Sequence, residues 1–269
     1  MQDIQADQAT NALARKVLAH WQQEFGSTVV TDEPFQHLYS QNIWPQDVYV
    51  ELLRLLPPRD LYQPLNIKQW VSKSGESTRD SCYLSETIDR MDSERAGFWT
   101  QIALAITSDS FKRLVFNKFK RDVALRLNVA PNRVDEANMF IGISLIRDME
   151  DYCLKPHPDG QPRVVTAQFY LPTDTSQKDL GTSIYEAVPL TQQLFSGRFR
   201  EVKRMPFLPN SGYAFAVNDQ PKRRSLHGRE LIESGSGIRN SILITWVSEK
   251  SDQRKANRGA FWETHRQFE

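Results

Sequence analysis

The sequence has almost no cysteine: Cys82 and Cys153 are the only two in 269 residues. Two cysteines are too few for a disulfide framework, and their separation fits no cysteine-based metal motif. The chain also lacks a run of roughly 18 apolar residues, the length that a membrane-spanning helix needs. Its first residues, MQDIQADQATNALARKVLAHW, contain no apolar core of the signal-peptide type. We therefore expect a cytoplasmic protein of a reducing compartment, with no membrane partner.

Net charge of either sign is also nearly absent. The 34 lysines and arginines almost balance the 33 aspartates and glutamates, which leaves a formal charge of +1. Such a chain has no overall field to attract nucleic acid or an anionic membrane. Residues 108–128 are a local exception, because an apolar stripe there is interspersed with Lys112, Arg113, Lys118, Lys120 and Arg121. Basic residues on the exposed face of an amphipathic helix are usually solvated, so nucleic-acid binding ranks last among the functions considered.

The rest of the composition is typical of a globular protein, with 39% apolar and 25% charged residues. A chain of this length can form one large domain. Apolar residues recur at helical spacing in the first half, which predicts helices over 9–25, 44–58, 93–107 and 108–128. Residues 1–138 are therefore expected to be mostly helical. Residues 249–269 are charged and weakly patterned, which indicates a C-terminal extension on the surface.

From about residue 139 the pattern changes to short β-rich segments separated by turn signals. Eight strands are predicted, at 139–147, 152–159, 163–171, 180–187, 200–207, 211–218, 224–231 and 239–248. Many short strands of this kind favour a closed barrel or jelly roll over a parallel sheet with crossover helices. The expected fold class is α+β with a mainly β core: a single domain, 1–269, in which the helices of 1–138 buttress a β core at 139–248.

A histidine and an aspartate lie two residues apart in the segment KPHPDG, each beside a proline. Residues that precede proline are pushed toward extended geometry, and alternate residues of a strand point to the same side. His157 and Asp159 could therefore bind one metal ion from that side. Alone, the pattern is also typical of an ordinary polar turn.

The remaining histidines favour a metal site. His20 and His37 lie in the helical half and His265 lies in the charged tail, so only His227 belongs to a second predicted strand of the β core. Two imidazoles and one carboxylate on one face of a metal are typical of non-haem Fe(II) centres with open positions for substrate and oxygen. A closed structural zinc site needs a fourth ligand, which neither cysteine is placed to supply.

Twelve residues after His227, Arg239 opens the apolar strand RNSILITW. Strand alternation puts Ser241 on the same side as Arg239. If that side faces the interior, the guanidinium could bind a carboxylate with two hydrogen bonds, and the hydroxyl could add another. The alternative is an arginine at a strand end in water.

Taken in order, His157-x-Asp159, His227 and Arg239-Asn240-Ser241 resemble the Fe(II)- and 2-oxoglutarate-dependent oxygenases, which have a cupin-like double-stranded β-helix. The segments LIRDMEDYCLKPHPD, RVVTAQFYLP, LGTSIYE and LPNSGYAFAVND resemble the surrounding strands of that core. The resemblance covers about residues 139–248. The segment NIWPQDVYVELLRLLPP resembles the helix that often precedes this core.

The resemblance implies that His157, Asp159 and His227 bind iron, and that Arg239, helped by Ser241, binds the distal carboxylate of the cosubstrate 2-oxoglutarate. It further implies that O2 is consumed, that succinate and carbon dioxide are released, and that a C–H bond of the substrate is oxidised while the protein orients that bond. Halogenating relatives lack the carboxylate ligand. Asp159 therefore favours hydroxylation, or a related desaturation or ring closure, over halogenation.

The expected substrate is a small molecule, such as an amino acid derivative or a natural-product or glycan precursor, because compact helical additions leave little room for a macromolecule-binding module. One alternative is a hydroxylase of protein side chains. Another is a non-catalytic cupin-like protein that binds a metal or a sugar, although such a protein has no need of the Arg239 clamp. Candidate pocket residues are Arg147, Tyr152, Gln168, Tyr170 and Thr182, and the loop 187–199 is a candidate lid.

Overall fold

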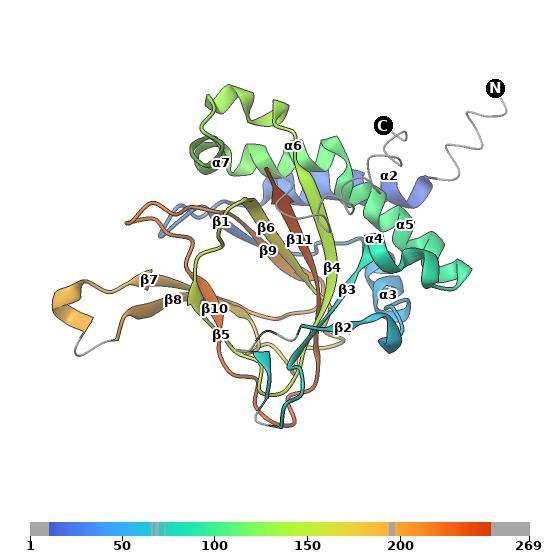
Figure 1. Ribbon diagram of the computed structural model, residues 1–269. Helices are drawn as coiled ribbons and strands as arrows, with labels where there is room; N and C mark the ends of the chain where they lie inside the picture. The colour runs from blue at the N-terminus through green and yellow to red at the C-terminus, as the bar shows by residue number, and fades with distance from the viewer. Residues whose placement is uncertain (1–10, 66, 68–69, 73, 194–196, 249–269) are drawn as a thin grey trace.

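Two antiparallel sheets form the body of the protein in a computed structural model that describes residues 11–65, 67, 70–72, 74–193 and 197–248 (Figure 1). The larger sheet has the strand order β1-β9-β6-β11-β4-β3-β2, and the smaller has the order β5-β10-β7-β8. The strand bounds are β1 His37–Gln41, β2 Gln63–Pro64, β3 Arg79–Tyr83, β4 Phe140–Asp148, β5 Leu154–His157, β6 Arg163–Tyr170, β7 Thr182–Ala187, β8 Phe199–Met205, β9 Ser211–Ala216, β10 His227–Arg229 and β11 Arg239–Val247.

The last eight of these strands, β4 to β11, form a jelly roll. Strands β4, β6, β9 and β11 lie in the larger sheet, and β5, β7, β8 and β10 make up the smaller one. The first strand of the eight pairs with the last, and the second pairs with the seventh. This order is that of a double-sheet jelly roll. The predicted double-stranded β-helix is therefore confirmed, and all eight strands expected from the sequence are present.

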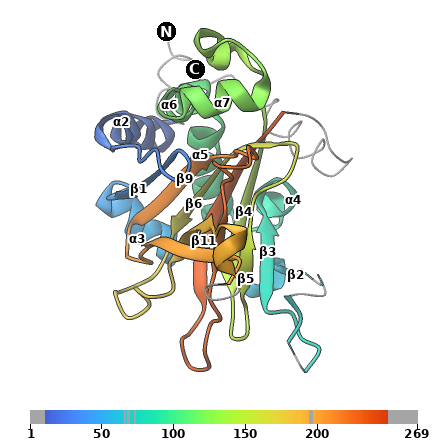
Figure 2. The same cartoon turned by 90° about the vertical axis from the view of Figure 1, so that its left-hand side faces the viewer.

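Helices cover the outer face of the larger sheet, as the two views show (Figures 1 and 2). The longer ones are α2 Ala12–Ser27, α3 Gln46–Arg54, α5 Ser93–Thr107, α6 Asp109–Lys118 and α7 Lys120–Leu127; the short elements are η1 Arg59–Leu61, α4 Leu84–Thr87, η3 Ile88–Arg90, η4 Pro131–Glu136 and η5 Leu190–Gln192. One hydrophobic cluster joins the helices to the outward-facing residues of the sheet, among them Phe169 and Trp246. None of the helices in the described ranges is long and apolar enough to cross a membrane.

Two expectations for the first half of the chain need correction. The single helix predicted over 108–128 is two helices, because the backbone leaves helical geometry at the buried residue Phe119 (φ −110°, ψ 24°). The region 1–138 also contributes three strands, β1 to β3, to the larger sheet. β3 has the polar sequence RDSCY and is extended because it pairs with the edge of β4. The expected extension 249–269 lies outside the described residues.

Strand β11 shows how the fold separates its two faces. Ile242, Ile244 and Trp246 belong to the cluster beneath the helices. The alternate residues Arg239, Leu243 and Thr245 line a cavity of about 290 Å³ inside the roll. The period of two along the strand thus places apolar residues toward the helices and the chemically active residues toward the cavity.

Candidate metal centre

Three of the side chains expected to bind metal come together inside the roll. His157 ends β5, Asp159 follows it, and His227 begins β10. The two histidines are direct partners across the β5–β10 pair, with ring centroids 4.5 Å apart. One ligand atom from each of the three residues lies within 4.8 Å of the other two. These three residues are therefore arranged so that they can hold one metal ion.

Both imidazoles are oriented by the backbone two residues before them. Nδ1 of His157 lies 3.0 Å from the carbonyl oxygen of Lys155, and Nδ1 of His227 lies 2.9 Å from that of Ser225. In each ring the Nδ1–H group donates to the carbonyl, which leaves Nε2 as the atom for a metal bond. A hydrogen bond of this kind is the usual way in which proteins fix a metal-binding histidine.

The carboxylate of Asp159 is buried and fully engaged. Oδ2 accepts a hydrogen bond of 2.7 Å from the hydroxyl of Thr166 on β6, and Oδ1 accepts one from Arg163. Burial alone would raise the pKa of Asp159, but His227, Arg163 and the bond from Thr166 together outweigh burial and hold the pKa below its ordinary value. The group is therefore ionised at neutral pH, as a metal ligand must be.

His227 is held in the neutral form that binds metals. Its side chain is buried, and burial is the main reason that its pKa falls to about 4, although the charge of Asp159 opposes the shift. Phe215 lies against the ring at a centroid distance of 4.7 Å. At neutral pH the imidazole carries no proton on the nitrogen that faces the site, so no proton has to leave before a metal binds.

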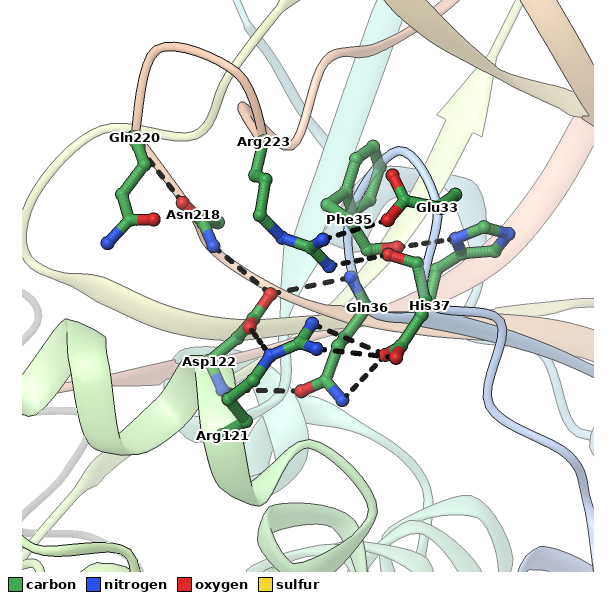
Figure 3. A network of polar contacts seen from close by, with 10 residues as sticks. Glu33, Phe35, Gln36, His37, Arg121, Asp122, Asn218, Gln220 and Arg223 are labelled. Atoms are coloured by element: carbon green, nitrogen blue, oxygen red, sulfur yellow. Dashed lines mark hydrogen bonds and ion pairs between the residues drawn. The ribbon is translucent and has the colours of Figure 1, made fainter.

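Figure 3 shows a polar network around Asp122 and Asn218, and Asn218 lies at the start of the loop that leads to His227. Nδ2 of Asn218, which follows β9, donates to Oδ2 of Asp122 on α7 at 3.1 Å. The N–H of Ser225 donates to the carbonyl of Asn218 at 2.8 Å, and the carbonyl of Ser225 accepts the bond from His227. Hydrogen bonds thus connect helix α7 to the second imidazole of the site.

Arg239 and Ser241 have the interior location that strand alternation predicts. Arg239 is 1% exposed; it forms an ion pair of 2.7 Å with Asp148 and donates to the carbonyl of Leu180 at 2.9 Å. Its guanidinium carbon lies 4.9 Å from the ring centroid of Tyr170. The hydroxyl of Ser241, which is fully buried, accepts a hydrogen bond of 2.7 Å from Nε2 of Gln168.

The structure adds charged residues that the sequence did not single out. Asp148 on β4 lies opposite both Arg239 on β11 and Arg79 on β3. Arg229, two residues after His227, lines the same cavity and donates to the carbonyl of Gly181 at 3.1 Å. The sequence does hold a signal for Arg79, because Arg79-x-Ser81 repeats the spacing of Arg239-x-Ser241. Residues 79–83 were not predicted to form a strand, so this spacing did not point to Arg79.

The candidate pocket residues divide into two groups. Tyr152, Gln168 and Thr182 line the cavity. Arg147 and Tyr170 do not, and both of these expectations were wrong. Asp148 faces inward, so its neighbour Arg147 points to the other side of β4, where it stacks on Tyr62 at 5.2 Å. Tyr170 is fully buried outside the lining, with its ring centroid 4.9 Å from the guanidinium carbon of Arg239. The candidate lid 187–199 contains residues 194–196, which lie outside the described residues.

Three of the basic residues of 108–128 that were considered for nucleic-acid binding make bonds within the protein. Lys118 donates to the carbonyl of Thr28 at 2.9 Å, and Arg121 forms an ion pair of 2.8 Å with Asp122. Lys112 forms an ion pair with Asp109 at 3.1 Å. These side chains therefore support the packing of α6 and α7.

Comparison with known proteins gives likenesses of structure only. No protein-family model matches the sequence, and no curated protein matches it significantly. Among solved structures, the non-haem α-ketoglutarate-dependent epimerase SnoN from nogalamycin biosynthesis is 10% identical, with a TM-score of 0.48, 91% of this chain covered and 89% of that one. A Pseudomonas putida prolyl-4-hydroxylase is 13% identical (TM-score 0.46; 88% and 99% covered). The Arabidopsis thaliana dioxygenase for auxin oxidation, AtDAO1, is 10% identical (TM-score 0.48; 89% and 89% covered).

Each of those activities belongs to the protein named. The site of this chain is defined by the geometry of its own residues. The strand order is that of a double-stranded β-helix. Within it, His157, Asp159 and His227 form a group that can hold a metal ion.

Proposed function

We propose that the chain is a non-haem Fe(II)- and 2-oxoglutarate-dependent oxygenase that hydroxylates a C–H bond of a small molecule. The observation that carries this proposal is the convergence of two imidazoles and one carboxylate at one end of a cavity that also contains buried arginines. Two histidines and a carboxylate on one face are the ligand set of non-haem Fe(II) oxygenases. When bound, iron and 2-oxoglutarate supply the oxidising chemistry with O2 and release succinate and carbon dioxide.

The donor set fits iron better than a structural zinc ion. His157, Asp159 and His227 are the group of potential metal ligands found among the described residues, and neither cysteine belongs to it. A structural zinc site is closed by four protein ligands. Three ligands leave positions for a cosubstrate and for oxygen, and the presence of Asp159 favours hydroxylation over halogenation.

In this proposal Arg239 binds the distal carboxylate of 2-oxoglutarate, with Ser241 beside it. The electrostatic surroundings of Tyr213 support the placement of one cosubstrate between the metal and Arg239. Burial is the main cause of the raised pKa of Tyr213, while Arg239 lowers that pKa and Asp159 raises it, so both groups lie within electrostatic reach of one phenol. The hydroxyl of Tyr213 donates to Oε1 of Gln168 at 2.8 Å, which holds the ring in the wall of the cavity.

The size of the cavity favours a small substrate. Its volume of about 290 Å³ has to hold the cosubstrate as well, and small-molecule sites usually measure roughly 300–1,000 Å³. A protein side chain as substrate stays an alternative of the same chemistry. A cupin-like protein without turnover is disfavoured, because it gives no reason for a buried arginine clamp.

The test is an anaerobic titration of the metal-free protein with Fe(II), followed by 2-oxoglutarate, in which the visible charge-transfer band of a keto acid bound to Fe(II) is recorded. We expect the band in the wild type and its loss in Asp159→Ala. In Arg239→Gln we expect 2-oxoglutarate binding to weaken by about 2–5 kcal/mol, as for a buried charge pair that loses one partner. Asp60→Ala is the matched control, since Asp60 is exposed and remote in sequence from the three ligands.

Absence of the band in a folded, metal-loaded wild-type protein would contradict the proposal and favour the non-catalytic cupin alternative. A band that persists in Asp159→Ala would remove Asp159 from the ligand set. Unchanged affinity for 2-oxoglutarate in Arg239→Gln would show that another residue binds the distal carboxylate.

A further inference from the structure

The cavity contains the arginine–serine pattern twice. Strand β3 carries Arg79 and Ser81, strand β11 carries Arg239 and Ser241, and β4 lies between the two. The two arginines are both paired in register with Asp148, and the two serines are both paired with the same residue of β4. Residues directly opposite in paired strands share a face of the sheet. The carboxylate-binding arrangement assigned to β11 therefore has a counterpart on β3.

The charges at this end of the cavity do not balance. The guanidinium groups of Arg79, Arg229 and Arg239 face the single carboxylate of Asp148, which lies 2.7 Å from Arg239 and 3.3 Å from Arg79. The only other acid in the lining formed by the described residues is Asp159, a metal ligand in the proposed function. Two positive charges thus remain, and the distal carboxylate of 2-oxoglutarate neutralises one of them. The second positive charge requires another anion to neutralise it.

Arg229 donates to the carbonyl of Gly181 at 3.1 Å. Its donors point to the same side as those of Arg239, since both side chains donate to the carbonyl of Leu180. Arg229 and Arg239 therefore belong to one site. Arg79 lies on the other side of Asp148 and is the centre of a second one.

Beside Arg79 two buried donors lack an acceptor, while Arg79 itself donates to the hydroxyl of Tyr152 and lies 3.3 Å from Oδ1 of Asp148, which makes no hydrogen bond among the described residues. The guanidinium carbon lies 5.3 Å from the ring centroid of Trp70 and 4.9 Å from that of Tyr152, so the group rests against two neighbouring aromatic rings. The hydroxyl of Ser81, a residue only 1% exposed, has no hydrogen-bond partner in the described part of the chain. The same is true of Nε1 of Trp70. Buried donors without acceptors are rare in native proteins and indicate a missing acceptor.

We propose that Arg79, Ser81 and Trp70 form a subsite for a carboxylate of the substrate, so that the molecule oxidised is a small carboxylic acid with an apolar body. This inference rests on the proposed function, because it assigns the first carboxylate site to 2-oxoglutarate. A carboxylate fits the fork of an arginine and carries the single charge that remains, whereas a phosphate carries about two at neutral pH. The apolar body is accommodated by lining residues that include Leu65, Ile146 and Leu154.

The experiment uses the full chain loaded with Zn(II), which supports no turnover, and with saturating 2-oxoglutarate. Saturation-transfer NMR compares phenylacetate, 3-phenylpropionate and hexanoate with their primary amides, which have the same shape and no charge. We expect at least one acid to bind and its amide not to bind. In Arg79→Gln the affinity for the acid should fall by about tenfold or more, as expected for the loss of a buried charge partner.

Three further variants sharpen the result. Ser81→Ala and Trp70→Phe remove one donor each, and Ser81→Ala nearly keeps the volume of the side chain, so each should weaken the binding of the acid even if Arg79→Gln fails to fold. Arg147→Gln is the matched control, because Arg147 also stacks on an aromatic ring and lies on the other face of β4. It should leave the binding of the acid unchanged.

The proposal is overturned if none of the acids binds, if acids and amides bind equally, or if a folded Arg79→Gln protein binds the acid as the wild type does. Competition between the acid and 2-oxoglutarate would also overturn it, since the two sites would then be one. Failure of the proposed function is seen separately, as an inability of the wild-type protein to bind 2-oxoglutarate in the same samples.

Discussion

Asp148 and Arg239 lie opposite each other on β4 and β11 and form an ion pair of 2.7 Å in which both side chains are only 1% exposed. The second oxygen of Asp148 lies 3.3 Å from Nε of Arg79, so one carboxylate holds two guanidinium groups in place. Removal of one partner from a buried ion pair is strongly destabilising, because the other charge is left without compensation. Asp148 therefore organises the arginine end of the cavity.

The first prediction concerns this carboxylate. Asp148→Ala should lower the free energy of unfolding by about 3–5 kcal/mol, because buried arginines lose their counter-charge. Urea unfolding measures the change. The matched control is Glu51→Ala, which removes the carboxylate of the exposed pair Arg54–Glu51 and should leave the free energy of unfolding nearly unchanged. Equal effects of the two substitutions would show that Asp148 has no special part in stability.

A glycine beside each of two metal ligands gives the second prediction. A Cβ at Gly228, next to His227, would lie 2.6 Å from the carbonyl oxygen of Leu154 and 3.1 Å from the nitrogen of Pro156, both in the backbone of β5. Gly228→Ala should therefore push β10 away from β5 and separate the two histidines. A Cβ at Gly160, next to Asp159, would meet no atom within 4 Å among the described residues, so Gly160→Ala is a closely matched control.

We expect Gly228→Ala to weaken the binding of Zn(II) by about 10- to 100-fold, the range seen when residues that orient metal ligands are changed. Gly160→Ala should bind the metal as the wild type does. Titration calorimetry on the metal-free proteins measures both affinities. Similar affinities of the two variants would mean that the separation of β5 and β10 does not set the geometry of the site.

The third prediction tests the network between helix α7 and His227. Asp122 accepts hydrogen bonds from Nδ2 of Asn218 at 3.1 Å and from the N–H of Gln36 at 3.4 Å (Figure 3). Asp122→Ala should lower the free energy of unfolding by about 1–3 kcal/mol for each buried donor left without an acceptor. It should also weaken Zn(II) binding, since the loop that carries His227 loses its attachment.

The control for Asp122 is Arg121→Gln. Its side chain pairs with Asp122 at 2.8 Å and is 45% exposed, so Arg121→Gln leaves the buried bonds of Asp122 to Asn218 and Gln36 in place and should destabilise the fold less than Asp122→Ala does. Urea unfolding and Zn(II) titration of both variants make the comparison. Metal affinity that stays unchanged in a destabilised Asp122→Ala protein would show that the network supports the fold without orienting His227.

Local patterns in the sequence predicted the β core and the convergence of His157, Asp159 and His227. In β11 alternate residues point to opposite faces, so the inward location of Arg239 follows from the location of Ile242 and Ile244 beneath the helices. The prolines around His157 force the extended backbone that puts this residue in β5. In both cases the residues within the segment itself were sufficient to predict its local structure.

What the sequence did not reveal depends on pairing between distant segments. The residues of β3 are polar and become a strand only because the edge of β4 is available to them. Asp148 pairs in register with Arg79 and Arg239, two arginines that lie far away in the sequence. Its role depends on both pairings. At Phe119 the backbone leaves helical geometry (φ −110°, ψ 24°) although the apolar period continues through it, so apolar periodicity did not report this break.

The last prediction concerns pH and His37, a fully buried residue of β1. Its Nδ1 lies 2.9 Å from the carbonyl oxygen of Phe35, and its Nε2 lies 3.5 Å from the ammonium group of Lys203. Burial, with a further contribution from the charge of Lys203, lowers the pKa of His37 below its ordinary value of 6.5. The folded protein therefore keeps this ring neutral at a pH where the unfolded chain already binds a proton.

Because the unfolded state then binds more protons, the free energy of unfolding should fall as the pH drops below about 6.5, by at most about 1.4 kcal/mol per pH unit from this one group. His37→Asn keeps a donor toward Phe35 and removes the titration. Urea unfolding between pH 7.5 and about pH 5 should give a steeper decline for the wild type than for the variant. His227, whose pKa also falls, is present in both proteins, so the difference between the two curves isolates His37. Parallel curves would show that His37 takes up its proton in the folded state as readily as in the unfolded chain.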